Sequence, residues 1–444
     1  MKKIYNTIRD IWSIEELRNK LILTLGFMAV YRFFAQVSLP WIDAAQLGAS
    51  ATANQGGLLG VINAFTGGAF SSASIMALGV MPYISASIVV QLMGIAVPYL
   101  QKLDKDGQSG QNKKTQITRW LTILITLVQG PAYILNMKSL GIPESAFLAD
   151  PSSMKFLIPA VTLLTAGSIF AMWLGEKITD KGIGNGISLL IMIGIIARFP
   201  SSFIQEVMTK LDAGSGAMIM ILLEIVVWFL VILLSVYLVT AVRRVTVQYA
   251  KRSVIGTIKS VGNTRDYLPL RLNSAGVMPI IFAQALMFVP ALLAQSGNET
   301  VSAIGTSFQD MFGLEYNILF AILIIIFSFF YTAITIPTNK MADDLKRQNG
   351  FIPGVKPGHD TAELLDTILS RITFPGSIYL ALLSVLPAFV VMFGVTQNWA
   401  LFYGGTSLII MVGVAIDSIQ QINAYLLNHH YDGLMKTSTG RRAK

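Results

Sequence analysis

Long apolar runs dominate the chain and alternate with shorter polar connections. Ten runs reach roughly 20 residues, which is enough for a helix to cross a hydrocarbon core of ~30 Å. They fall near residues 21–39, 75–97, 118–137, 155–174, 186–205, 217–240, 274–294, 317–337, 375–394 and 402–426. The strands of membrane barrels are shorter and alternate apolar with polar positions. The pattern therefore predicts an all-α membrane protein with ten transmembrane helices.

Two nonapeptides occur twice along the chain, with six of nine positions identical in each pair. The pairs are GVMPYISAS at 79–87 with GVMPIIFAQ at 276–284, and GISLLIMIG at 186–194 with GTSLIIMVG at 405–413. Corresponding copies lie five crossings apart, and this odd number gives them opposite directions across the membrane. The pattern predicts two inverted-repeat halves, residues 21–205 and 217–426, with the functional path between them near the bilayer midplane.

Lysine and arginine residues indicate the orientation of the chain in the membrane. Of the 33 such residues, 28 lie in the N-terminal segment 1–20, the tail 427–444 and the connections on their side, whereas 4 lie in the opposite connections. Because cytosolic loops carry the excess of basic residues, we expect both termini in the cytosol. The net charge of +9 then marks the cytosolic face and does not require a nucleic-acid partner. The amphipathic segment 1–20 lies either at the membrane surface or against the protein's own cytosolic side.

Residues that support metal binding or catalysis are scarce. The chain has no cysteine and three histidines, His359, His429 and His430. His429 and His430 are neighbours, so their side chains would diverge on a helix. The chain also lacks the G-x-x-x-x-G-K-[ST] phosphate loop and any His/Asp/Glu cluster of the kind that a membrane-embedded enzyme needs. We therefore expect no catalytic residues, no metal site and no cofactor.

The repeated segments instead offer aliphatic faces. Residues four apart share a helix face, and four such pairs occur: Val80 with Ile84, Ile187 with Ile191, Val277 with Ile281, and Thr406 with Ile410. If these faces point at the interface of the halves, they surround the midplane with aliphatic side chains. Ordinary helix packing would explain the same pattern. Pro82 and Pro279 lie inside the repeated segments, where we expect them to kink their helices.

Charged residues within the spans are few, and we expect them away from the midplane. Arg32, Arg198 and Glu224 fall toward the outer ends of their spans, and Asp417 falls toward an inner half. A transporter coupled to protons or sodium normally places an ionisable group at the midplane. The pattern therefore favours an apolar constriction that gates by dewetting. A secondary transporter for small solutes, built from inverted repeats, remains the alternative.

Several longer stretches resemble the SecY/Sec61-alpha family of protein-conducting channels, and the resemblance covers all ten spans in order. They are residues 64–93, 175–191, 243–253 with 267–283, and 351–361 with 404–410. One position departs from the family pattern, because Lys356 stands where the family usually has arginine. The lysine keeps the charge but cannot form the two parallel hydrogen bonds of a guanidinium.

This resemblance implies the central pore-forming subunit of the Sec translocase in a bacterial plasma membrane. Such a subunit passes unfolded polypeptides across the membrane, releases hydrophobic segments sideways into lipid, and is not itself an enzyme. The implied partners are the small membrane subunits SecE and SecG, the motor ATPase SecA, the ribosome, signal peptides with unfolded preproteins, and membrane lipids.

The resemblance also implies roles for individual residues. The pore ring would comprise Val80, Ile84, Ile187, Ile191, Ile281 and Ile410. The plug, about residues 58–72, would include Leu58, Ile62, Phe65, Gly67, Gly68 and Phe70, with the two glycines making it flexible. The lateral gate, between spans 2 and 3 and spans 7 and 8, would include Ser87, Gln129 and Gln284. Loops 241–273 and 338–374 would dock SecA or the ribosome through Arg243, Arg244, Lys251, Arg252 and Lys356, although orientation alone also explains these charges.

Overall fold

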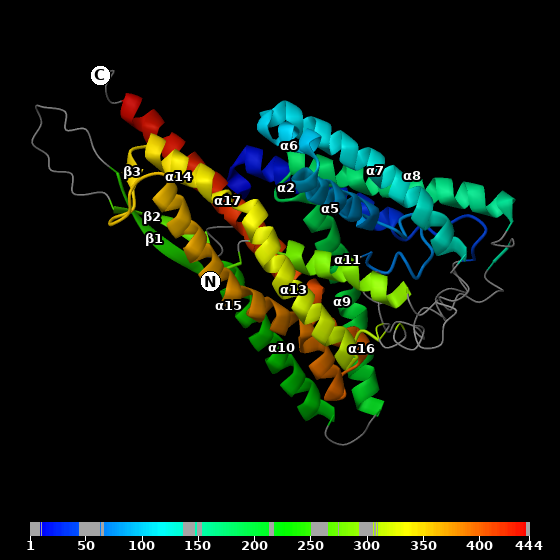
Figure 1. Cartoon of the computed structure of the whole chain (residues 1–444). Coiled ribbons are helices and arrows are strands. Elements are labelled where there is room, and N and C mark those ends of the chain that lie inside the picture. Colours follow the sequence, from blue (N-terminus) through cyan, green and yellow to red (C-terminus); the bar gives the residue numbers. More distant parts are fainter. Residues whose placement is uncertain are drawn as a thin grey trace, which may run out of the picture. The chain divides into compact units, whose positions relative to one another are not determined.

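The computed structural model describes residues 11–43, 66–135, 153–212, 217–249, 265–273, 275–292 and 310–440, with the single positions 9, 63, 147, 148, 305 and 308. These residues are mostly helical (Figure 1). They form two compact units. The first unit comprises Met1–Ala213, Gln397–Trp399 and Val414–Lys444, and the second comprises Gly214–Thr396 and Ala400–Gly413. The last part of the chain is therefore shared between the two units.

The first unit is a helical bundle. Its helices are α2 (Glu15–Phe34), α5 (Met81–Ala96), α6 (Pro98–Lys105), α7 (Gly107–Leu135), α8 (Met154–Lys181) and α9 (Gly186–Asp212). Helix α8 packs against α2, α7 and α9, and α5 packs against α7. Glycines allow the close approach of α8 to α9, since a Cβ on Gly175 would lie 2.7 Å from the Ile187 side chain.

The second unit combines helices with three strands. Its elements are α10 (Ala217–Thr240), β1 (Val242–Tyr249), β2 (Arg265–Arg271), α11 (Met278–Leu292), α13 (Leu314–Thr335), α14 (Thr338–Arg347), β3 (Gly350–Phe351) and α15 (His359–Met392). Helix α13 packs against both α11 and α15. Two further helices follow, α16 (Gln397–Ala400) and α17 (Gly405–Gly440), and each contributes residues to both units.

The helical class of the chain is confirmed, while the number of spans stays a prediction. Six described helices are long and apolar enough to cross a membrane: Met154–Lys181, Gly186–Asp212, Met218–Thr240, Leu314–Arg347, His359–Met392 and Gln397–Leu427. Helix α15 has 34 residues, and at a rise of 1.5 Å per residue it is about 50 Å long. This exceeds the hydrocarbon thickness of ~30 Å, so α15 must extend beyond the membrane.

The prediction of an all-α chain is wrong in the polar connections. Strand β1 pairs antiparallel with β2 on one side and β3 on the other, in the order β2-β1-β3. The sheet covers a small apolar core contributed by β1, β2, α14, the loop after β3, and α15. This core comprises Val245, Val247, Leu270, Leu345, Ile352, Leu365 and Leu369. The described parts of the two loops predicted to dock partners, 241–249, 265–273 and 338–374, therefore pack around one core. Strands β1, β2 and β3 with these core residues are called here the docking sheet, after their predicted role.

The prediction that Pro82 and Pro279 kink their helices is also wrong. Helix α5 begins at Met81 and α11 begins at Met278, so each proline occupies the second position of its helix. Proline is favoured in a first turn because its missing N–H has no partner there in any case. The apolar runs at 75–97 and 274–294 are thus longer than their helices, which end at Ala96 and Leu292.

The end of the N-terminal segment packs on the chain itself. Residues 15–20 continue directly into the first span as part of α2. The Lys20 ammonium donates a hydrogen bond of 2.7 Å to the Tyr425 hydroxyl and forms an ion pair of 2.9 Å with Glu16. Both contacts raise the pKa of Lys20, and the tyrosine contributes most. For residues 15–20 this favours packing on the protein over the membrane surface.

Candidate functional site

All six residues predicted for the pore ring lie at the beginning of a helix. Val80 caps α5, Ile84 and Ile281 lie in the first turns of α5 and α11, and the remaining members lie within the first two turns of α9 and α17. Val80, Ile191 and Ile410 are 3%, 5% and 2% exposed, whereas the other three are half-buried. Each of the two units contributes members of this set.

A glycine with a left-handed backbone stands at the start of each of these four helices, or two residues before it. The φ angles are 50° at Gly79, 83° at Gly184, 64° at Gly276 and 63° at Gly405. Side chains other than glycine are strained in this region. Three of these glycines, Gly79, Gly276 and Gly405, belong to the repeated segments, and they turn the chain sharply into the helix that carries the aliphatic residue.

The two GVMP segments have the same local hydrogen bonding. The Val80 carbonyl accepts a bond of 3.1 Å from the amide of Ile84, and the Val277 carbonyl accepts one of 3.4 Å from Ile281. Within the second unit, a Cβ on Gly413 would lie 3.4 Å from the Val277 side chain. The start of α11 and the first turns of α17 are therefore in contact.

The three residues predicted for the lateral gate have different surroundings. Ser87 on α5 is half-buried and accepts a bond of 3.1 Å from Gln91 one turn along the same helix. Gln129 on α7 is exposed, whereas Gln284 on α11 is 4% exposed. The helices involved are packed in neighbouring pairs, α5 with α7 in one unit and α11 with α13 in the other. The structure does not test whether the two pairs face each other, so the lateral gate stays a prediction.

The described end of the predicted plug is firmly held. Gly67 and Gly68 both have a positive φ, 65° and 92°. The amide of Gly68 donates a bond of 2.9 Å to the carbonyl of Asn63, and the amide of Ser71 donates one of 3.1 Å to the Asn63 side chain. The two glycines form a hydrogen-bonded turn in this structure, and the expected flexibility of the plug stays a prediction. Leu58, Ile62 and Phe65 lie outside the described residues.

Phe70, the remaining member of the predicted plug, is anchored to α7. The Tyr133 hydroxyl donates a bond of 2.7 Å to the Phe70 carbonyl, and the two rings lie 4.7 Å apart between centroids. Just beyond, the amide of Leu39 donates to the Ala73 carbonyl at 2.8 Å. The segment that leads from the plug to α5 is thus bound both to α7 and to the residues that follow α2.

The docking sheet has one packed face and one open face. Val245 and Val247 of β1 are buried in its core, with Leu270 of β2 beside them. The alternate residues of both strands point to the other side, since successive side chains of a strand alternate. The described members of this open face that are exposed are Val242, Arg244, Thr246, Tyr267, Pro269 and Arg271. Tyr267, which is 52% exposed, pairs with Thr246, and Arg244 and then Arg271 follow it in one direction along this face.

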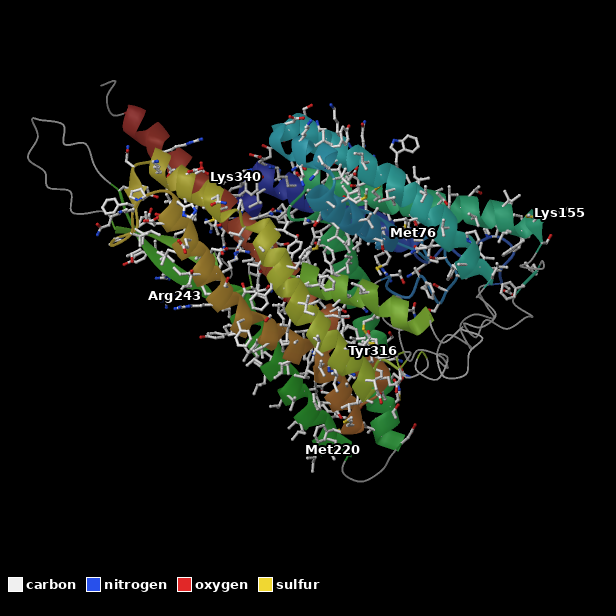
Figure 2. All side chains as sticks on the ribbon, viewed as in Figure 1. Met76, Lys155, Met220, Arg243, Tyr316 and Lys340 are labelled. Carbon is white, nitrogen blue, oxygen red and sulfur yellow. The ribbon has the colours of Figure 1, made fainter. Side chains whose placement is uncertain are left out.

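The predicted docking residues do not share one surface. Arg243, labelled in Figure 2, is exposed on β1 but pairs with the buried Leu270, which places it at the edge of the packed face. Arg244 lies on the open face. Lys356 is exposed in the loop between β3 and α15, and its carbonyl accepts a bond of 2.8 Å from the Thr361 hydroxyl. Lys251 and Arg252 lie outside the described residues.

Comparison with known proteins gives a consistent result. A model of the SecY family matches residues 74–419. The Protein translocase subunit SecY of Streptomyces scabiei is 39% identical over 431 residues, covering 95% of this chain and 97% of that protein.

The chain belongs to the SecY family.

Two solved structures show that the fold is also that of this family. The chain is similar to the structure of a protein-conducting channel, with a TM-score of 0.63 and 17% identity over 92% of each chain. It is also similar to Sec61 in the canine ribosome–channel complex from the endoplasmic reticulum, with a TM-score of 0.58, 17% identity and 92% coverage of each chain. SecY-family membership makes this chain a membrane-embedded channel subunit of the Sec translocon, and the chain is not an enzyme.

Some residues of interest were not assigned a role from the sequence. The SecY resemblance picked out Arg244, but not Tyr267 and Arg271, which the pairing of β1 with β2 places on the same face. The alternation of valines in RRVTVQY was the available signal for this strand. Arg32 was recognised as a charge within a span, but nothing in the sequence identified its acceptor.

Proposed function

We propose that this chain forms the conduit of a Sec translocase in a bacterial plasma membrane, with both termini in the cytosol. The observation that carries the proposal is the similarity over 95% of the chain to a protein translocase subunit. The asymmetry of basic residues, 28 against 4, supports the orientation. Unfolded polypeptides would pass between the two repeat halves, and hydrophobic segments would leave sideways into lipid.

The pore ring of six aliphatic residues would form the seal of this conduit. Their common position at helix starts supports the assignment, because it puts branched apolar side chains next to a sharp glycine turn in four separate helices. A narrow aliphatic constriction does not hold a stable column of water, so it blocks ions when closed. Aliphatic side chains also form no specific hydrogen bonds, which suits a passage for polypeptides of any sequence.

Ser87, Gln129 and Gln284 would lie along the lateral gate. Each of them is a polar side chain on one of the helices α5, α7 and α11, and α5 packs against α7. This supports the assignment. Polar side chains can bond across membrane helices with modest energy, about 0.6 kcal/mol on average. Such weak contacts suit a seam that must open and close.

The docking sheet would bind the partner that drives translocation. Its open face presents Arg244, Arg271 and the exposed Tyr267, and Lys356 is exposed in the adjoining loop. This combination of guanidinium groups and an aromatic ring suits ribosomal RNA phosphates and bases, or acidic side chains of SecA. We include SecE and SecG as the small membrane partners, because the resemblance to the family implies them.

Reconstitution tests the proposal directly. The full chain, co-expressed with SecE and SecG, is placed in lipid vesicles with SecA, ATP and an unfolded preprotein. We expect the preprotein to become protected from external protease, and this protection to require a signal sequence. Protection that is absent under these conditions, combined with gradient-driven uptake of a small solute, would instead identify a secondary transporter.

A further inference from the structure

Arg32 is a charged residue in an unfavourable position. It belongs to α2 and lies within the first apolar run, 21–39. A charged side chain within a membrane span is costly to bury, so such residues usually serve a function and have a defined partner. The Nη1 atom of Arg32 donates a hydrogen bond of 3.2 Å to the carbonyl of Gly67, at the described end of the predicted plug.

Gly67 is held tightly at the point where it accepts this bond. Its φ of 65° lies in the left-handed region. A Cβ at this position would collide with the Arg32 guanidinium and would lie 2.9 Å from both the Cα and the carbonyl oxygen of Gly194 on α9. Gly67 is therefore wedged between the arginine of α2 and the backbone of α9. Only glycine fits here without displacing one of them.

The Arg32 contact lies at one end of an ordered stretch of chain. After Gly67, the backbone is bound successively to Asn63, to Tyr133 of α7 through Phe70, and to residues 37–39 through residues 73–75. In the bond to the Gly67 carbonyl, the donor is the charged guanidinium of Arg32. A hydrogen bond with one ionised partner is roughly twice as strong as a neutral one.

We infer that Arg32 is a positioning residue that fastens the plug in its closed place by bonding the Gly67 carbonyl. The inference rests on the proposed function and adds to it a determinant of which signal sequences can open the channel. When the plug leaves, the Gly67 carbonyl must break this bond, so the bond stabilises the closed state over the open state. Weakening it shifts the population toward open channels without changing the pore ring.

The experiment uses the full chain in its complex with SecE and SecG and compares Arg32→Met, Arg32→Lys and Arg119→Met. Methionine keeps an unbranched apolar stem but removes the donors, and lysine keeps the charge without the guanidinium. Arg119 is the matched control, because it pairs with Glu176 between α7 and α8 through a guanidinium that does not bond the plug. Because the chain has no cysteine, Ser71→Cys in each background supplies a single thiol on the plug side of the bond.

Three readouts are measured: the labelling rate of the thiol introduced by Ser71→Cys with a membrane-impermeant reagent, the resting ion conductance, and export of a preprotein with a weakened signal. Loss of a hydrogen bond to a charged group changes an equilibrium by roughly ten- to a hundredfold. For Arg32→Met we expect labelling at least about tenfold faster, a measurable resting current and export of the weak-signal substrate. Arg32→Lys should be intermediate, and Arg119→Met should match the unmodified channel.

Gly67→Ala provides a second route to the same conclusion if Arg32→Met assembles poorly. Its added methyl group meets the guanidinium as well as the α9 backbone, so it should produce the same three changes. The double variant should be less leaky than the two single effects combined, because both substitutions remove the Arg32–Gly67 contact. Normal signal stringency and a tight resting state in Arg32→Met or in Gly67→Ala, while the unmodified chain translocates, would overturn the inference. An unmodified chain that fails to translocate would instead reject the proposed function.

Discussion

The two GVMP segments begin their helices in the same way but follow different parts of the molecule. In the first unit, the chain that enters Gly79 comes from the predicted plug and is tied to residues 37–39. In the second unit, the chain that enters Gly276 comes directly from β2 of the docking sheet, and the amide of Leu272 donates a 2.9 Å bond to Ala241 at the end of α10.

Their immediate environments differ as well. A Cβ on Gly79 would lie 3.3 Å from the Thr66 side chain and 3.5 Å from the Tyr31 hydroxyl, whereas a Cβ on Gly276 would meet no atom of the described residues within 4 Å. Among the described residues, the same turn is therefore packed in one unit and open in the other. We interpret the difference as a division of control: the first copy connects a predicted pore helix to the predicted plug, and the second connects a predicted pore helix to the proposed partner-binding surface.

Alanine at each of the two glycines should separate these roles. Both substitutions place a side chain in the left-handed region, which costs of order 1–3 kcal/mol. Gly79→Ala also crowds Thr66 and Tyr31, so we expect it to destabilise the protein by about 2–3 kcal/mol, against about 1 kcal/mol for Gly276→Ala. Thermal unfolding of both variants in the same detergent measures the difference. Equal losses of stability would show that the packing around Gly79 is unimportant.

Charge reversal on the docking sheet, which precedes the second GVMP segment, should weaken partner binding. Changing Arg244 and Arg271 together to Glu replaces attraction by repulsion on the open face, and we expect SecA or ribosome binding to weaken at least about tenfold, or ~1.4 kcal/mol. Arg243→Glu is the comparison, because Arg243 is also predicted to dock but lies at the edge of the packed face, so we expect a smaller loss of binding. Binding is measured at near-physiological salt. An equal effect of Arg243→Glu would reject the open face as the specific contact.

The smallest effect is expected at Lys356. Lys356→Glu should impair translocation severalfold by reversing an exposed charge beside the docking sheet, whereas Lys356→Arg should change it little, since the charge is retained. Translocation of a preprotein into vesicles with SecA and ATP measures both variants. Full activity of the Glu variant would mean that the charge of this loop has no role in this chain.

Hydropathy was sufficient to predict where most helices lie but not where two of them begin. The run at 75–97 is apolar throughout, yet α5 starts only at Met81, because Gly79 turns the chain and Pro82 is favoured in a first turn. A hydropathy profile does not register φ angles. The same limit explains why both prolines were expected to kink helices that they actually start.

The docking sheet shows a different limit. The alternation of Val245 and Val247 indicates a strand by itself, but β3 has two residues and its pairing with Gln248 and Tyr249 depends on tertiary contact. The Arg32–Gly67 bond is likewise invisible in sequence, because it joins residues 35 apart through a side chain and a backbone carbonyl. By contrast, repeats and aliphatic spacing mark the positions of the predicted pore ring together with Val277 and Thr406, and the resemblance to the SecY family selects the six members.

The central claim, that the aliphatic residues at these helix starts seal a polypeptide conduit, is tested most directly at Ile410. Ile410 is 2% exposed in the first turns of α17, and asparagine would place an amide with two donors and an acceptor in the seal. The loss of aliphatic contacts should cost the closed state a few kcal/mol by analogy with core truncations. Single-channel current in planar bilayers should then show ions leaking through resting Ile410→Asn channels, together with export of a weak-signal reporter. An electrically tight variant with unchanged signal stringency would contradict the account and make Ile410 an ordinary packing residue.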